Sequence, residues 1–375
     1  MKYDLGFLGG GQLARMSIQA AQRMGLRCVC LDPAEDCCAG QIADHIQGEL
    51  NDPASIARTI EQSEHITLEN EFIPAEAIRT ALEAARRGES VITPGIDTLA
   101  TIQDKLIQRE AMSRAGVPSP NAAALVDPEA LLARVLDDPA DWQPVVMKAR
   151  FGGYDGKGTR YGRTREEFAQ NLPTLDPRPS TLPPWLIEDF VPFQRELAVM
   201  VFIDSQTKGA FPTMETVQTN HVCDLVYPSD ANAKDIAIAA VEAVGGHGLF
   251  GVELFQLESG EILVNEIAPR PHNTGHYTLD WGGTSQFEQH VRLAMHLPID
   301  PFPTGHATCM ANLLGVEGAF DLREATRRAL AYPGVHVHWY GKAMRPGRKV
   351  GHINVRGVPD LIDRASKARE AFFAG

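Results

Sequence analysis

Short apolar runs alternate with amphipathic stretches over the first hundred residues of the chain. The apolar runs have the length of buried strands and lie at residues 4–9, 27–33, 65–70 and 90–95. The stretches at 12–25 and 74–88 repeat apolar residues at helical spacing, and each ends at a glycine. Strands that alternate with helices predict a parallel, doubly wound α/β sheet covered on both faces. Its ligands are expected at the carboxyl ends of the strands, which carry Gly9–Gln12, Asp32 and Glu69–Glu71.

The pattern changes near residue 98. Residues 97–120 predict one long helix with a Gly-Val-Pro exit, and valine-rich strands separated by polar turns then continue to about residue 295. Hairpin signals such as Ser259 and Gly260 indicate that these strands are antiparallel. Residues 298–307 resemble a linker, and the remaining segment predicts a smaller unit that ends in a helix at 359–374.

Composition narrows the class of protein. The 375 residues are 44% hydrophobic and 22% charged, which is typical of a globular protein. The net charge of −13 argues against a non-specific nucleic-acid binder, which needs basic surfaces to neutralise phosphates. We expect no membrane span, because no apolar run approaches about 18 residues. The six cysteines lack paired zinc spacing and the N-terminus lacks a signal-peptide pattern, so we expect free thiols and a cytoplasmic protein.

The first glycine motif has two interpretations. Gly9, Gly11 and Ala14 follow an apolar run, and Asp32 comes 18 residues after Ala14. This spacing is close to the dinucleotide-binding fingerprint, which leaves an NAD-dependent oxidoreductase open.

A second glycine-rich segment, KARFGGYDGKGTRY, covers residues 148–161. Glycines allow backbone N–H groups to surround an anion, and Lys157 adds a point charge suited to a phosphate. Lys148 precedes the glycines in an apolar strand. The segment is not a Walker A loop, since no Gly-Lys-Ser/Thr opens a helix.

Acidic and basic side chains form four further groups. Glu253 and Glu266 lie on two strands of one hairpin, where like carboxylates favour a shared Mg²⁺ and Asn265 adds an oxygen; the alternative is that one glutamate faces solvent. A proline-bounded loop then presents Arg270, His272 and Asn273. Glu188 and Glu196 suit a nucleotide pocket, and the basic cluster Lys342, Arg345, Arg348 and Lys349 predicts either a second phosphate site or a solvated turn.

Four segments together resemble one family. GGGQLARM (9–16), KARFGGYDGKG (148–158), NEIAPRPHNTGH (265–276) and YGK…RPGRKVGHI (340–353) are similar, in order, to the N5-carboxyaminoimidazole ribonucleotide synthetases of the ATP-grasp superfamily. The resemblance implies an α/β and α+β chain. A Rossmann-like pre-ATP-grasp domain would span 1–98, an ATP-grasp domain 99–297 with a lid at about 118–190, and a domain completing the substrate site 298–375.

The resemblance also implies the reaction. ATP, bicarbonate and 5-aminoimidazole ribonucleotide would give N5-carboxyaminoimidazole ribonucleotide, ADP and phosphate through carboxyphosphate, with Mg²⁺ as cofactor, in a homodimer. The N-terminal glycine loop would then receive the ribonucleotide substrate and not a dinucleotide.

The resemblance also implies a role for each residue that occupies a matching position in the family's motifs. ATP is assigned to Lys105, Lys148, Gly152, Gly153, Gly156, Lys157, Gly158, Glu188, Asp189, Phe190, Val191, Glu196, Asn265 and Glu266, with the metal on Glu253 and Glu266. The catalytic group is Tyr154, Asp155, Lys157, Arg270 and His272, where Asp155 would be the base for the substrate amine and Arg270 and His272 would bind bicarbonate. The ribonucleotide is assigned to Gln12, Leu13, Glu69, Asn273, Lys342, Arg348 and Lys349.

Gln218 stands where the family pattern has a histidine, and His221 lies three residues later, which leaves the nucleotide contacts of this segment open. A formate-dependent glycinamide ribonucleotide transformylase, a related ATP-grasp enzyme, is the main alternative. A non-catalytic nucleotide-binding module is a further one, which the candidate metal acids and Asp155 argue against.

Overall fold

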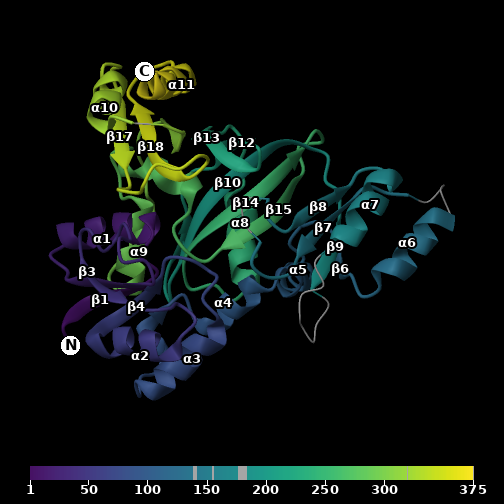
Figure 1. Ribbon diagram of the computed structural model, residues 1–375, viewed down its shortest axis with the longest axis horizontal. Coiled ribbons are helices and arrows are strands. Elements are labelled where there is room, and N and C mark those ends of the chain that lie inside the picture. Colours follow the sequence, from purple (N-terminus) through teal and green to yellow (C-terminus); the bar gives the residue numbers. More distant parts are fainter. Residues whose placement is uncertain (138–141, 154–155, 176–183, 319, 375) are drawn as a thin grey trace.

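The N-terminal part is a parallel sheet in the order β3-β2-β1-β4-β5. In this computed structural model, which describes residues 1–137, 142–153, 156–175, 184–318 and 320–374, the sheet lies at the lower left of Figure 1. Its strands are β1 (Tyr3–Leu8), β2 (Cys28–Asp32), β3 (Asp44–Gln47), β4 (Ser63–Leu68) and β5 (Ile92–Thr93). Its helices are α1 (Gln12–Arg23), α2 (Pro53–Gln62) and α3 (Ala75–Ala84), with the short η1 (Glu89–Val91).

The four predicted strands and the parallel arrangement are confirmed, whereas β3 and α2 were missed. A signal for α2 is present in the sequence. Asp52 accepts hydrogen bonds from the backbone N–H groups of Ala54 and Ser55, and Pro53 occupies the first helical position. An acidic N-cap followed by proline is a standard helix start.

The single long helix predicted after residue 97 is wrong. Two helices are present, α4 (Ile96–Gln103) and α5 (Lys105–Arg114), and Asp104 separates them in an extended conformation. The carboxylate of Asp104 caps α5, and it also pairs with the Arg150 guanidinium, with 2.5 Å between Oδ2 and Nη2. An ion pair with a residue far along the chain therefore fixes the break.

A small antiparallel sheet in the order β6-β9-β7-β8 forms the right-hand part of Figure 1. Its strands are β6 (Ala122–Ala124), β7 (Val145–Ala149), β8 (Thr159–Gly162) and β9 (Trp185–Asp189). They are accompanied by α6 (Pro128–Asp137), α7 (Arg165–Asn171) and η3 (Leu172–Thr174). Met147, Phe168 and Trp185 form its buried centre.

A large antiparallel sheet occupies the middle of the molecule, in the order β15-β14-β10-β12-β13-β16-β18-β17, with β11 on β10. The strands are β10 (Phe193–Ile203), β11 (Lys208–Ala210), β12 (Met214–Thr219), β13 (Val222–Pro228), β14 (Gly248–Leu257), β15 (Ile262–Ala268), β16 (Thr308–Leu314), β17 (Val335–Trp339) and β18 (Lys349–Arg356). The helices are α8 (Lys234–Ala243), η4 (Asn273–Leu279), α9 (Gln286–Ala294), α10 (Leu322–Leu330) and α11 (Leu361–Phe373).

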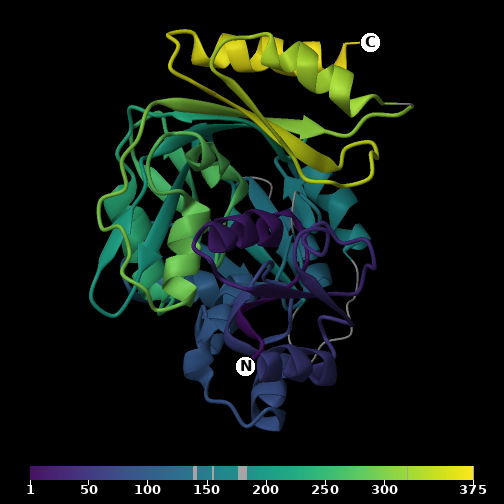
Figure 2. The ribbon, with the colours of Figure 1, turned by 90° about the vertical axis from the view of Figure 1, so that its left-hand side faces the viewer.

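The C-terminal strands β16–β18 continue this sheet beyond β13, so the last segment does not form a separate sheet. Helices α10 and α11 cover the outer face of these strands (Figure 2). Because β17 and β18 belong to this sheet, the basic segment between them lies against the N-terminal part of the chain. Across the described ranges, no helix is long and apolar enough to span a bilayer.

Candidate active site

One large cavity, of about 1450 Å³, lies where the N-terminal sheet, the small sheet, the large sheet and the β17–β18 connection meet. The predicted residues that line it are Gln12, Leu13, Glu69, Lys105, Lys148, Gly153, Gly156, Lys157, Gly158, Glu188, Asp189, Phe190, Val191, Glu196, Glu253, Asn265, Glu266, Arg270, His272, Asn273, Lys342, Arg348 and Lys349. Gly152 is described but does not line it, and Tyr154 and Asp155 lie outside the described residues. Segments from all parts of the chain thus share one cavity.

The two predicted metal acids stand side by side. Glu253 on β14 is in register with Glu266 on β15. Burial, together with the negative charges of Glu266 and Glu196, raises the pKa of Glu253 to about 7. A carboxyl group with so high a pKa lacks sufficient positive charge nearby, which is the condition that a divalent cation relieves.

Lys105 donates to the Oε1 atom of Glu266, which leaves Glu253 as the less compensated of the two acids. No group of three or more His, Cys, Asp or Glu side chains able to hold a metal ion occurs within the described part of the chain. A cation at this pair therefore needs further oxygens, such as those of a nucleotide phosphate.

Glu188 on β9 belongs to a buried ion-pair group. Its carboxylate accepts from Arg109 Nε at 2.8 Å and lies 2.7 Å from Lys148 Nζ. Burial by itself would raise the pKa of Glu188, but the two cations outweigh burial and lower the pKa to about 2. Because both carboxylate oxygens of Glu188 already bind cations, a nucleotide would have to contact the backbone at this position.

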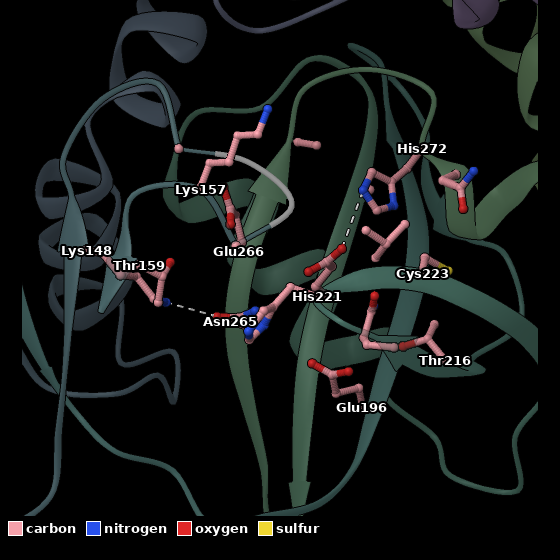
Figure 3. A pocket seen from close by; sticks show the side chains of 18 of the residues that line it. Lys148, Lys157, Thr159, Glu196, Thr216, His221, Cys223, Asn265, Glu266 and His272 are labelled. Carbon is pink, nitrogen blue, oxygen red and sulfur yellow. Dashed lines mark hydrogen bonds and ion pairs between the residues drawn. The ribbon is translucent and has the colours of Figure 1, made fainter. Parts of the chain in front are cut away.

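Lys148 also donates to Asn265 Oδ1 at 3.2 Å (Figure 3), so its ammonium group joins Glu188 to the residue that precedes Glu266. Burial lowers the pKa of Lys148, although Glu188 opposes this effect. The lysine thus links the buried ion pair to the cavity. Further along β10, burial raises the pKa of Glu196 to about 7.

His272 lies beside Glu253, with 3.5 Å between Nε2 and Oε1 (Figure 3). Burial, aided by Arg270 and Lys349, lowers the pKa of its imidazole to about 3, so the ring is neutral near pH 7. Gln286 on α9 holds the backbone of His272 at both ends. Its Oε1 accepts from the N–H group at 3.0 Å, and its Nε2 donates to the C=O group at 2.8 Å.

Arg270 is not an isolated cation. Its guanidinium makes two bonds to the carboxylate of Glu71, one of them 2.7 Å between Nη2 and Oε1. Sequence reasoning placed Glu71 at the end of a strand but did not identify this pairing. An arginine tied to a carboxylate keeps a fixed orientation, and its remaining N–H groups are presented in a defined direction.

The opposite end of the cavity joins the N-terminal loop to the C-terminal segment. Lys342 donates to Gln12 Oε1, and the backbone N–H group of Leu13 donates to Glu69 Oε1 at 3.4 Å. Gly11 is packed so closely that a Cβ atom there would lie 2.0 Å from Oε1 of Glu69. The glycine is therefore needed for the approach of this acid to the loop.

Asp32 does not line the cavity. Its Oδ2 accepts from the N–H group of Gly10 at 2.8 Å and its Oδ1 from that of Ala34 at 2.9 Å. In a dinucleotide site the corresponding acid holds a ribose hydroxyl. Here the carboxylate stabilises the loop itself.

Several lining residues were not predicted, among them Tyr161, Arg163, Thr216 and Cys223. They lie on strands or strand ends as ordinary core or surface types. No local signal distinguishes them from the rest of the sheet.

Three parts of the chain match known protein domains. Residues 1–103 match the ribonucleotide synthetase preATP-grasp domain, 110–287 the ATP-grasp domain, and 308–360 the phosphoribosylaminoimidazole carboxylase C-terminal domain. The N5-carboxyaminoimidazole ribonucleotide synthase of Mycobacterium tuberculosis is 36% identical, over 96% of this chain and 86% of that protein. The chain belongs to the N5-carboxyaminoimidazole ribonucleotide synthase family. The family and the ATP-grasp fold predicted from the sequence are confirmed.

Other members extend the comparison. The synthase of Synechococcus elongatus is 38% identical, over 94% of this chain and 89% of that protein. A crystal structure of the Aspergillus clavatus synthase in complex with ADP and 5-aminoimidazole ribonucleotide matches with a TM-score of 0.87 and 30% identity, over 99% of this chain and 98% of that one. The Thermus thermophilus synthetase matches with a TM-score of 0.82 and 32% identity, over 98% and 97%.

Fungal relatives are longer than this chain. The phosphoribosylaminoimidazole carboxylases of Ogataea methanolica and Saccharomyces cerevisiae are both 38% identical over 94% of this chain. The chain spans 66% and 63% of their lengths, respectively.

Proposed function

We propose that the protein catalyses the ATP-dependent carboxylation of 5-aminoimidazole ribonucleotide by bicarbonate, giving N5-carboxyaminoimidazole ribonucleotide, ADP and phosphate. The observation that carries the proposal is the large cavity that the Glu253–Glu266 pair shares with the glycine-rich segment and with the basic residues around Lys342. The names of the bacterial relatives, and the relative crystallised with ADP and this ribonucleotide, support the same substrates.

Bicarbonate is a poor electrophile because its leaving group would be hydroxide. In the proposed first step a bicarbonate oxygen bonds to the γ-phosphorus of ATP, the bond to the β–γ bridging oxygen breaks, and ADP leaves with that oxygen. Carboxyphosphate then releases phosphate, while the exocyclic amine of the ribonucleotide bonds to the carboxyl carbon and loses a proton.

The carboxylate pair fits Mg²⁺, because Lys105 and Lys349 only partly offset the effects of burial and of the neighbouring acids on Glu253. When bound there, Mg²⁺ would neutralise the charge of the transferring phosphoryl group. Lys105 and Lys148 would bind phosphate oxygens, since both ammonium groups lie at this end of the cavity. We propose that Glu196 holds the nucleotide ribose and that the backbone near Asp189–Val191 reads the base.

Bicarbonate would bind beside Arg270, which Glu71 orients, and beside the neutral imidazole of His272. The ribonucleotide would lie between Gln12 and Lys342, with its phosphate towards Arg348 and Lys349. Asp155, predicted from the sequence, remains our proposed base for the amine proton. Exclusion of water from the cavity would protect carboxyphosphate from hydrolysis.

An ADP-release assay tests the proposal. The protein is incubated with Mg–ATP and bicarbonate, with and without 5-aminoimidazole ribonucleotide, and the carboxylated product is measured alongside ADP. We expect release and product to depend on all three substrates. Turnover with glycinamide ribonucleotide plus formate, and none with 5-aminoimidazole ribonucleotide, would instead establish the transformylase alternative.

We also propose that the protein works as a homodimer, as the family resemblance implies, and that it is cytoplasmic, as its cysteine usage indicates. Light scattering coupled to size-exclusion chromatography measures the assembly directly. The mass of a single chain across the working concentration range would contradict the dimer.

A further inference from the structure

The β12–β13 hairpin places a histidine in an unfavourable backbone conformation. Its two loop residues, Asn220 and His221, join Thr219 to Val222, which are paired in register. Their φ angles are +52° and +64°. Turns of this kind favour Asn followed by Gly, because both positions need a left-handed backbone. Asn220 fits that preference, whereas His221 occupies the position that usually holds glycine.

The imidazole of His221 lies against the glycine-rich segment of the small sheet. Gly156 approaches it so closely that a Cβ atom there would lie 2.7 Å from Cβ and 2.8 Å from Cγ of His221. Gly156 itself has a φ of +74°. The contact joins two separate sheets, because Gly156 precedes β8 whereas His221 belongs to the large sheet.

A second contact supports the first. The His221 ring stacks on Tyr161 of β8, with 6.0 Å between the ring centroids and 19° between their planes. The guanidinium of Arg163 lies over the Tyr161 ring at 4.1 Å, and Phe190 meets that ring edge-on. All four side chains line the cavity. The His221 ring, at the hairpin, therefore ends a row of aromatic contacts that begins in the small sheet with Phe190 and Tyr161. Figure 3 shows His221 at the edge of the cavity, near Asn265.

We propose that His221 is a positioning residue that holds Gly156–Gly158 against the bound nucleotide, by packing between that segment and Tyr161. This inference rests on the proposed function and extends it to a residue outside the predicted set. An unfavourable backbone persists where the surrounding structure or function compensates for it. Here the compensation is the contact between the two sheets on either side of the nucleotide cavity.

The turn itself supplies a matched pair of variants. Both His221→Gly and Asn220→Gly relieve a positive φ, but only His221→Gly removes the ring from Gly156 and Tyr161. Both should fold, because glycine suits each position. His221→Asn is a second test variant, since asparagine tolerates this backbone and lacks the ring.

Affinity for Mg–ADP is measured by calorimetry without ribonucleotide, and the ratio of ADP released to carboxylated product is measured at saturation. Losing one aromatic contact should weaken Mg–ADP binding by about five- to tenfold in His221→Gly and His221→Asn. Their ratio of ADP to product should also rise above that of the wild type. Asn220→Gly should match the wild type in both measurements.

A double-mutant cycle addresses the Gly156 contact. Gly156→Ala should weaken Mg–ADP binding, and part of that loss should disappear when His221→Gly is added, because the clash with the imidazole is gone. Additive losses would overturn the contact as the cause.

Equal affinity and equal product ratio in His221→Gly and Asn220→Gly would overturn the proposal. A wild-type protein that bound Mg–ADP without forming carboxylated product would refute the carboxylation, while the affinity comparison would still decide the role of His221. A wild-type protein that bound no Mg–ADP would refute both.

Discussion

Replacement of Glu253 by glutamine should show how much the carboxylate pair lowers the free energy of unfolding without metal. It should also show how much the pair contributes to the binding of Mg–ADP. Burial and the neighbouring acids raise the pKa of Glu253 from its ordinary value of 4.5 to about 7. In the folded protein this carboxyl keeps its proton between these two pH values, whereas in the unfolded chain it loses the proton. Without ligand, the free energy of unfolding should therefore fall as pH rises from 4.5 to 7, and then level off.

The expected change in the free energy of unfolding follows from the pKa shift of Glu253 and from the exposed fraction of its side chain. One pKa unit corresponds to about 1.4 kcal/mol, so full burial would give about 3 kcal/mol. Because 33% of the Glu253 side chain is exposed, we expect solvent screening to reduce the effect to about 1–2 kcal/mol. Glu253→Gln should be more stable than the wild type by that amount at pH 8, and equal to it near pH 4.5, as measured by urea unfolding.

Binding of Mg–ADP should reverse this order of stability, so that the wild type becomes more stable than Glu253→Gln. Mg²⁺ requires the ionised carboxylate, so binding of Mg–ADP to the wild type at pH 6.5 should expel a measurable fraction of a proton from Glu253, and less at pH 8.5. Calorimetry in buffers of different ionisation enthalpy measures this release, and its excess over that of Glu253→Gln isolates the contribution of Glu253. Apparent metal affinity should fall about tenfold per pH unit below 7.

Glu196 has a similarly raised pKa and supplies the matched control. Glu196→Gln should retain part of the proton release that Glu253→Gln loses, because the charge of Glu196 contributes only a share of the raised pKa of Glu253. The reasoning is refuted if Glu253→Gln and the wild type release the same number of protons at pH 6.5. It is also refuted if Glu253→Gln is the less stable protein at pH 8 without metal.

Three further predictions follow from the same cavity. Glu188→Gln would leave the ammonium of Lys148 without its buried counter-charge and should lower the free energy of unfolding by about 3–5 kcal/mol; a loss below about 1 kcal/mol in urea unfolding would contradict this. Gln286→Leu should lower kcat about tenfold through misplacement of His272 while the KM for ATP changes little, and steady-state kinetics with equal effects on both would disagree. Lys342→Ala should raise the KM for 5-aminoimidazole ribonucleotide about 10- to 100-fold and leave that for ATP nearly unchanged, so equal changes would place its role elsewhere.

Local patterns were sufficient for the family and for four strands of the N-terminal sheet, although they missed β3 and α2. Apolar runs separated by helical stretches predicted the parallel sheet of β1, β2, β4 and β5, because a strand and a helix differ in a periodicity that neighbouring residues reveal. Short glycine-rich and proline-bounded segments identified part of the cavity lining, since loops that approach a ligand need special backbone conformations.

Contacts between distant residues were decided only by the tertiary structure. The helix break at Asp104 depends on Arg150, and the orientation of Arg270 depends on Glu71, 199 positions earlier. Sequence alone cannot show which charges meet across a packed interior.

Electrostatics depends on the same packing. Glu188 and Glu253 are both glutamates on strands, yet the pKa of the first is lowered to about 2 and that of the second is raised to about 7. The sequence by itself determined that acidic residues would occupy these strands. The family resemblance assigned Glu188 to ATP binding and Glu253 to metal binding. Only the tertiary structure decided which of them is neutralised by buried cations and which is left to attract one, because the interaction energy of a charge depends on its neighbours in space and on its distance from water.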